Sequence, residues 1–157
     1  MLNQFSQVDI FQEEQFDGIV AVGGGSALDA GKAIALATAV GCQDLWKYVF
    51  RSPDIPSPAC EIPPVIAIPT TAGTGSEVDA NAVITDEGEH VKRSLYHPQL
   101  LPRIVIADPA LTQSLPPSLT AATGMDALSH NLEALCSPVF NPMLDAIALQ
   151  GIGYIKE

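Results

Sequence analysis

Apolar residues along the chain fall into short continuous runs separated by glycine-rich and proline-rich connections. Residues 18–22 and 65–68 are runs of Val, Ile, Ala and Gly, and 83–85 and 104–107 are similar but shorter. Runs rich in β-branched residues predict strands. Because these runs do not alternate with polar residues, they indicate a parallel sheet covered on both faces, as in α/β folds.

Helical patterns follow the first strand and dominate the end of the chain. Residues 27–39 combine strong helix formers with an apolar spacing that predicts a mostly buried helix. Residues 51–64 hold five of the 13 prolines and predict an irregular connection. Residues 117–135 and 142–155 predict two helices, the first opened by a proline pair.

The change from strands to helices after Asp108 predicts two parts. We expect an α/β dinucleotide-binding domain over residues 1–112 and the beginning of a helical domain over 113–157.

Composition and charge exclude several classes of partner. The chain has 157 residues, of which 47% are hydrophobic, and a formal net charge of -11. This charge argues against a nucleic-acid or anionic membrane surface, so a dinucleotide would have to be held by backbone N–H groups. Three widely spaced cysteines and the lack of a signal-like N-terminus predict a cytoplasmic protein with reduced thiols. Asp29, Lys32 and the glycine triplet at 23–25 interrupt the apolar stretch 18–41, which therefore does not indicate a membrane span.

Two glycine-rich loops follow apolar strands. The first is GGGS at 23–26, where glycines let a pyrophosphate approach the backbone at a helix N-terminus. Its spacing is not GxGxxG, and a tight turn that needs positive φ is the alternative. The second is TTAGTGSE at 70–77, whose hydroxyls can bind phosphate, ribose or carboxamide, or can merely cap a helix. Two such loops together predict a ligand crevice at the carboxyl ends of the strands.

Asp126 and His130 stand four residues apart in a predicted helix, so both project from one face. A carboxylate and an imidazole at this spacing can bind one divalent metal. Taken alone, the pair is better explained as an i,i+4 hydrogen bond or a helix-surface pair. His90 and His97 lie in a polar stretch and are expected to face solvent.

Four segments together resemble the iron-containing alcohol dehydrogenase family. They are GGGSALDAGKAIA at 23–35, AIPTTAGTGSEV at 67–78, LPRIVIADPALT at 101–112 and LPPSLTAATGMDALSHNLEAL at 115–135. The resemblance implies a parallel-sheet α/β cofactor domain followed by an all-helical domain, the dehydroquinate synthase-like architecture. It also implies hydride transfer between NAD or NADP and an alcohol or aldehyde substrate, with the metal polarising the substrate oxygen.

The resemblance assigns roles to particular residues. It places Gly24, Gly25 and Ser26 at the cofactor pyrophosphate, Lys92 near the nicotinamide ribose, and Asn81 and Leu111 at the nicotinamide end. The second cofactor loop matches four hydroxyl residues, namely Thr70, Thr71, Thr74 and Ser76. Asp126 and His130 match the first two of four ligands to Fe²⁺, or to Zn²⁺ or another divalent metal. No side chain matches a dedicated catalytic base.

Measured against the family pattern, the sequence lacks the two later histidine ligands and the first strands. We therefore expect a fragment that is inactive by itself, from a protein that forms a homo-oligomer at full length. Two alternatives stay open: a non-catalytic nucleotide-binding fragment of the same fold, and a dehydroquinate synthase-like lyase.

Overall fold

The computed structural model describes residues 6–52, 54–58 and 60–155 and divides the chain into two compact units. The first unit, here called the sheet unit, comprises Met1–Thr70 and Ser76–Asp108. The second, the helical unit, comprises Thr71–Gly75 and Pro109–Glu157. The middle of the second glycine loop thus packs with the helices, although both of its ends belong to the sheet unit.

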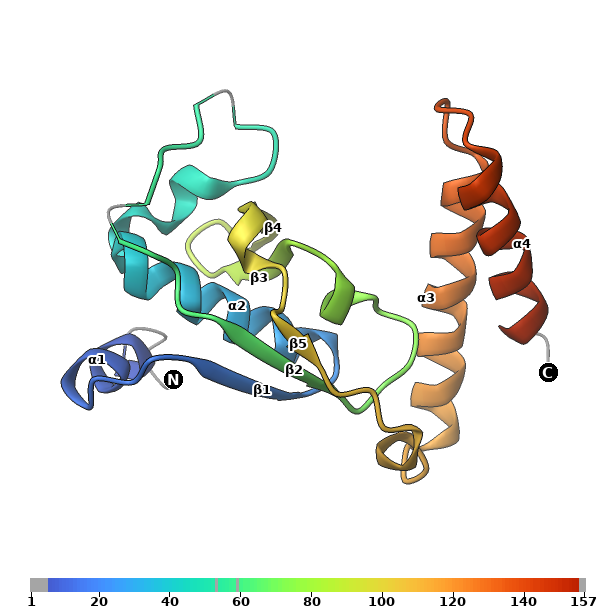
Figure 1. Cartoon of the computed structure of the whole chain (residues 1–157), viewed down its shortest axis with the longest axis horizontal. Coiled ribbons are helices and arrows are strands. Elements are labelled where there is room, and N and C mark those ends of the chain that lie inside the picture. The colour runs from blue at the N-terminus through green and yellow to red at the C-terminus, as the bar shows by residue number, and fades with distance from the viewer. Residues whose placement is uncertain (1–5, 53, 59, 156–157) are drawn as a thin grey trace. The chain divides into compact units, whose positions relative to one another are not determined.

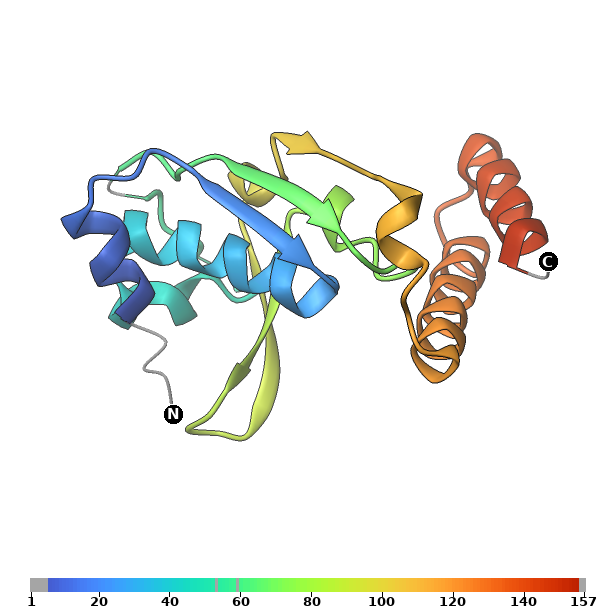
Figure 2. The ribbon, with the colours of Figure 1, turned by 90° about the horizontal axis from the view of Figure 1, so that it is seen from below.

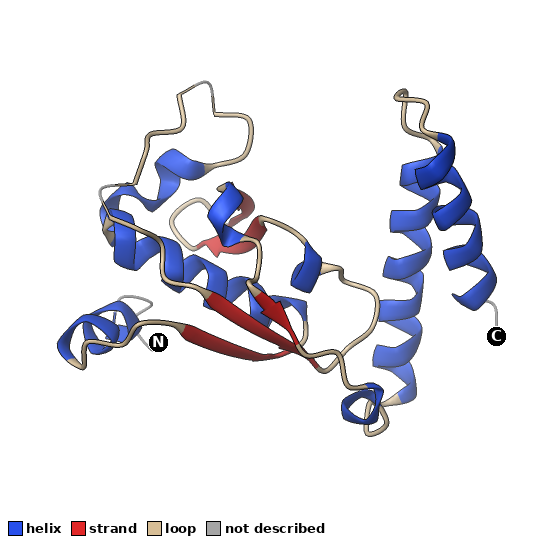
Figure 3. Cartoon of the chain, in the orientation of Figure 1, coloured by secondary structure: helices blue, strands red, loops and turns tan. Residues whose placement is uncertain are grey.

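A parallel sheet lies at the centre of the sheet unit (Figures 1 and 3). It contains β1 (Ile19–Gly23), β2 (Val65–Pro69) and the short β5 (Ile104–Val105), in the order β1-β2-β5. The register of the first pair runs from Ile19 opposite Val65 to Gly23 opposite Pro69. The predicted strands at 18–22 and 65–68 are therefore confirmed as neighbours in one parallel sheet. Of the predicted strand at 104–107, only Ile104–Val105 is a strand, and it joins the same sheet.

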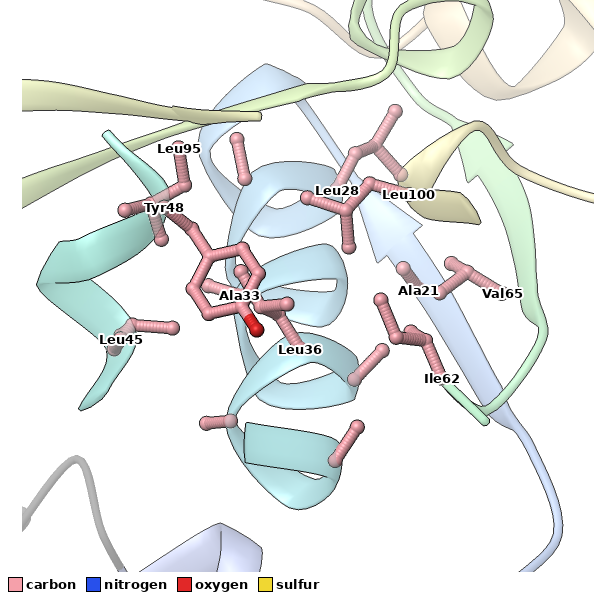
Figure 4. Close-up of a cluster of buried hydrophobic side chains, with 14 of the residues drawn as sticks. Ala21, Leu28, Ala33, Leu36, Leu45, Tyr48, Ile62, Val65, Leu95 and Leu100 are labelled. Atoms are coloured by element: carbon pink, nitrogen blue, oxygen red, sulfur yellow. The ribbon is translucent and has the colours of Figure 1, made fainter. Parts of the chain in front are cut away.

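Helix α2 (Gly25–Val40) follows β1 and packs on one face of this sheet. Leu28 and Leu36 are buried against Ala21, Val65 and Leu100, and Figure 4 shows this cluster. A Cβ at Gly31 would lie 2.7 Å from the Ala21 Cβ, so glycine at this position lets the helix approach β1 closely. The apolar pattern of residues 27–39 is explained by this burial.

The opposite face of the sheet is open within the sheet unit. Val20, Val22 and Ile104 are 61%, 55% and 52% exposed, and α2 lies on the other side (Figure 2). The expectation of a sheet covered on both faces is therefore wrong for the described part of the chain. The continuous apolar strands correctly indicated an α/β sheet, but only one of its two faces has a partner here.

A second sheet carries the remaining strands. The antiparallel hairpin of β3 (Asn81–Asp86) and β4 (Val91–Tyr96) forms a two-stranded sheet, so the predicted strand at 83–85 does not join the parallel one. The carboxylate of Asp86 accepts a 2.8 Å hydrogen bond from Nε of Arg93 across this hairpin. Strand β4 and helix α1 (Ser6–Glu13) were not predicted from the hydrophobic pattern.

Short 3-10 turns complete the sheet unit. They are η1 (Cys42–Tyr48), η2 (Ser76–Val78) and η3 (Pro98–Leu100). Two aromatic residues of η1 contact other parts of the sheet unit. Tyr48 is buried in the core, and Trp46 lies under the guanidinium of Arg93 from the hairpin.

Two helices form most of the helical unit. After the turn η4 (Pro109–Thr112), α3 (Pro117–Leu135) and α4 (Pro142–Ile155) pack against each other, as Figure 1 shows. Both have the bounds that the sequence predicts, and Pro117 stands in the first turn of α3. In the described part of the chain, no helix combines the length and the apolar character needed to cross a membrane.

His97 departs from the sequence expectation, because it is half-buried and does not face solvent freely. Its Nδ1 accepts a 3.3 Å hydrogen bond from the Gln99 N–H, and its ring packs edge-on to Tyr48. Desolvation by burial lowers the pKa of His97 below its ordinary value of 6.5. His90, in contrast, is exposed as expected.

Because the pKa of His97 is lowered, we expect the folded chain to lose stability in mild acid. The unfolded chain takes up the proton first, so the free energy of unfolding should decrease as pH falls below about 6.5. Urea unfolding at a series of pH values measures this slope. His97→Gln should flatten it. An equal slope in the His97→Gln variant would contradict the assignment.

Candidate functional site

The first glycine loop divides into a residue that the turn requires and residues that it does not. Gly23 has φ +146°, and a Cβ there would lie 2.6 Å from the Ala27 Cβ, so the turn itself demands glycine. Gly24 has φ −74° and ψ 179°, which any residue adopts. Gly25 does not have a positive φ either. The turn geometry therefore explains why residue 23 is glycine, but it does not explain why residues 24 and 25 are glycine.

Close approach of a ligand to the start of α2 would explain glycine at both positions. Gly24 caps α2 without a side chain, and the first N–H groups of a helix have no acceptor within the helix. An anion can approach such N–H groups directly when no Cβ stands in front of them. Ser26, two residues after Gly24, is exposed and adds a hydroxyl to this end.

The two glycine loops begin side by side at the carboxyl edge of the parallel sheet. Gly23 is the register partner of Pro69, and the Thr70 N–H donates a 2.9 Å hydrogen bond to the Gly23 carbonyl. The prediction that the loops adjoin at this edge is confirmed. This is the edge where ligand crevices form in open α/β sheets.

The end of the second loop returns to α2. The Ser76 hydroxyl donates to a carboxylate oxygen of Asp29, and the Lys32 ammonium donates to the Ser76 carbonyl at 2.8 Å. Asp29 and Lys32 were treated in the sequence only as charges that interrupt an apolar stretch. Their spacing of three residues on a buried helix was the available signal, because buried charges are paired.

The remaining cofactor candidates are Asn81 and Lys92 in the sheet unit and Leu111 in the helical unit. Asn81 begins β3, where its side-chain amide donates to the Asp79 carboxylate at 2.8 and 2.9 Å. Its amide oxygen accepts a 3.3 Å bond from the Ser94 hydroxyl. Lys92 is exposed on β4 opposite Thr85. Leu111 lies in η4, in the helical unit, and is 39% exposed.

Two glycines of the second loop pack on α3 within the helical unit. Gly73 has φ +139°, and a Cβ there would overlap the Thr123 carbonyl and lie 2.8 Å from its carbon. Gly75 has φ +67°, and a Cβ there would lie 3.8 Å from Nδ1 of His130. The loop backbone therefore runs along the turns of α3 that carry the proposed metal ligands. In this loop, the Thr71 hydroxyl is buried without a hydrogen-bond partner.

Asp126 and His130 project from one face of α3, as the sequence predicts. Oδ1 of Asp126 and Nε2 of His130 are 3.6 Å apart, beyond hydrogen-bond range, and the side chains are 44% and 50% exposed. The two side chains therefore form no hydrogen bond, but they do form an i,i+4 pair on the helix surface, which is the alternative interpretation of these residues. A carboxylate oxygen and an imidazole nitrogen fit two positions around a divalent metal. The described residues contain no group of three or more potential ligands.

Comparison with known proteins identifies the family. The family model described as iron-containing alcohol dehydrogenase matches residues 6–109. The NAD-dependent methanol dehydrogenase of Bacillus methanolicus is 43% identical over 150 residues, which cover 96% of this chain and 38% of that protein. The chain therefore spans well under half the length of this curated relative.

Solved structures agree with these sequence matches. The crystal structure of a 1,3-propanediol oxidoreductase superposes with a TM-score of 0.86 at 41% identity, covering 97% of this chain and 38% of that one. The sulfoacetaldehyde reductase from Bifidobacterium kashiwanohense, solved in complex with NAD+, gives 0.85 at 34% identity, covering 97% and 39%. These matches confirm the α/β fold class with a following helical part. The chain belongs to the iron-containing alcohol dehydrogenase family.

Proposed function

We propose that this chain supplies the cofactor loops and two metal ligands of an NAD(P)-dependent oxidoreductase that interconverts an alcohol and an aldehyde or ketone. The observation that carries the proposal is the hydrogen bond between Thr70 and Gly23, which sets two glycine loops together at the carboxyl edge of the sheet. Relatives named as dehydrogenases and a reductase favour this chemistry over a lyase.

In this proposal each part of the chain has its own task. Residues 1–112 form the dinucleotide-binding domain, with Gly24, Gly25 and Ser26 at the pyrophosphate. The second loop contributes the hydroxyls of Thr70, Thr71, Thr74 and Ser76 to cofactor binding. Lys92 lies near the nicotinamide ribose, and Asn81 and Leu111 line the nicotinamide end. Residues 113–157 begin the metal-binding domain. We place the protein in the cytoplasm, since its three cysteines are free in the structure.

The metal candidates fit a hard or borderline divalent ion such as Fe²⁺ or Zn²⁺. Asp126 and His130 would hold it, and when bound it would supply Lewis-acid polarisation of the substrate oxygen. The protein itself positions the substrate and the cofactor, because hydride transfer depends on their alignment. No residue of this chain is assigned as a general base.

Titration with NADH tests the cofactor assignment directly. We expect the 157-residue chain to enhance and shift NADH fluorescence in a saturable manner, and unlabelled NAD+ or NADP+ to compete. Absence of saturable binding by the folded chain would overturn the proposal, since its central claim concerns residues that are all present.

The metal site gives a separate prediction. The chain alone should bind Zn²⁺ or Fe²⁺ only weakly and should not oxidise alcohols, because Asp126 and His130 leave most of the coordination to water. Calorimetry with Zn²⁺, and an NAD+ or NADP+ reduction assay with short alcohols, measure both. Tight one-to-one Zn²⁺ binding that survives Asp126→Ala, or any alcohol turnover, would refute this prediction.

A further inference from the structure

Lys32 is a fully buried ammonium group whose partners are almost all backbone. It is 0% exposed, and its Nζ donates to the carbonyls of Ser76 at 2.8 Å, Asp79 at 3.2 Å and Asn81. These three carbonyls belong to a segment of six residues that lies 44 to 49 positions further along the chain. A lysine ammonium has three N–H donors, so the three carbonyls of this segment can accept from all of them.

Asp29 neutralises this charge and holds the same segment. Its Oδ1 lies 3.0 Å from Lys32 Nζ, and the same oxygen accepts from the Ser76 hydroxyl. Its Oδ2 accepts a 3.0 Å hydrogen bond from the Val83 N–H. The two side chains therefore contact η2, the start of β3 and the connection between them from a single turn of α2.

This arrangement links the two cofactor loops through one helix. Helix α2 begins at Gly25 of the first loop, and Asp29 and Lys32 lie in its next turn. Ser76 lies near the end of the second loop, and Asn81 follows it as a nicotinamide-end candidate. The start of the second loop is already fixed by the bond from Thr70 to Gly23. The buried pair fixes the other end, so the loop is held at both of its ends.

We propose that Asp29 and Lys32 are positioning residues that set the second cofactor loop relative to the first, and so determine affinity for the nicotinamide half of the dinucleotide. This inference rests on the proposed function. The pair reaches no ligand itself and acts through the backbone of residues 76–83. A buried ion pair can often be replaced by apolar residues without loss of stability, so its specific value here lies in directing three carbonyls to one point.

Two variants separate positioning from simple stabilisation. Lys32→Met removes the three carbonyl bonds but leaves Asp29 without its counter-charge. The double variant Asp29→Asn with Lys32→Met removes both charges and restores a neutral site. Lys47→Met is the matched control, since it deletes one lysine charge on the exposed side of η1.

Hydrogen–deuterium exchange and ligand titration provide the two readouts. In the charge-balanced double variant we expect faster amide exchange confined to residues 76–83. NADH affinity should be weakened about tenfold, as it is when only a tenth of molecules keep the binding-competent loop. Affinity for ADP, which reaches only the first loop, should be unchanged. Lys47→Met should match the unaltered chain in both readouts.

The outcomes are distinguishable. NADH affinity equal to that of the unaltered chain in the double variant, or equal losses for NADH and ADP, would overturn the positioning role. Unchanged exchange of residues 76–83 would overturn the proposed restraint itself, whether or not a cofactor binds. If the unaltered chain binds neither NADH nor ADP, the proposed function fails together with the affinity claim, and the exchange measurement still decides whether the pair restrains the loop.

Discussion

Gly25→Val is expected to abolish measurable NADH binding without unfolding the chain. Gly25 is the first residue of α2, where N–H groups without intrahelical acceptors face the proposed pyrophosphate. A branched side chain there would stand between the phosphate oxygens and these donors. Losing two hydrogen bonds to a charged group is worth about 3 kcal/mol or more, so affinity should fall at least about a hundredfold.

The structure removes backbone strain as an explanation for this loss. Positive φ in the GGGS turn falls at Gly23, not at Gly25, so valine at 25 does not force a disfavoured conformation. Gly153→Val is the matched control, because a Cβ at this α4 glycine meets nothing within 4 Å. NADH titration and urea unfolding are measured on both variants. Unchanged affinity in Gly25→Val would show that this loop does not touch the pyrophosphate.

Gly73→Ala should produce the largest loss of stability in the helical unit. Its φ of +139° is a conformation that L-residues rarely adopt, at a cost of about 1–3 kcal/mol. The added Cβ would also overlap the Thr123 carbonyl, so the loop must move off α3. We expect a total loss of about 3 kcal/mol or more, since strain and overlap add. Urea unfolding measures it, and amide exchange in α3 locates it.

Gly124→Ala provides the opposite result at the neighbouring position of α3. A Cβ at Gly124 meets nothing within 4 Å, and the residue lies inside a helix. Alanine there should stabilise the chain by about 0.5–1 kcal/mol, because glycine loses more conformational freedom when a helix forms. If both variants were equally destabilising, the contact between the second loop and α3 would have to be abandoned.

Local patterns were sufficient for most of the regular elements. Strands β1 and β2, helix α2 and the pair α3 and α4 follow from runs and periodicities of neighbouring residues, and both C-terminal helices have their predicted bounds. The adjacency of the two glycine loops also followed, because parallel strands bring their carboxyl ends to one edge. The i,i+4 placement of Asp126 and His130 needed only the helical repeat.

Pairing and burial between distant segments decided the rest. Strand β4 has three consecutive polar residues at 92–94, and Leu95 is its only buried residue, so its pairing with β3 is what makes it a strand. His97 is partly desolvated because Tyr48, far away in sequence, packs against it. The open face of the sheet could not be predicted either, since an apolar strand does not show how many layers cover it.

The GGGS motif shows, within four residues, the same difference between what the sequence predicts and what the structure decides. GGGS identified the loop, but only backbone angles showed that Gly23 serves the turn while Gly24 and Gly25 do not need to be glycine for that purpose. Asp29 and Lys32 were visible as charges in an apolar helix, yet their acceptors come from residues 76–83. The sequence by itself determined the elements and the family, because these depend on short-range patterns. Tertiary structure decided which backbone groups each side chain holds, because those partners are brought together only by folding.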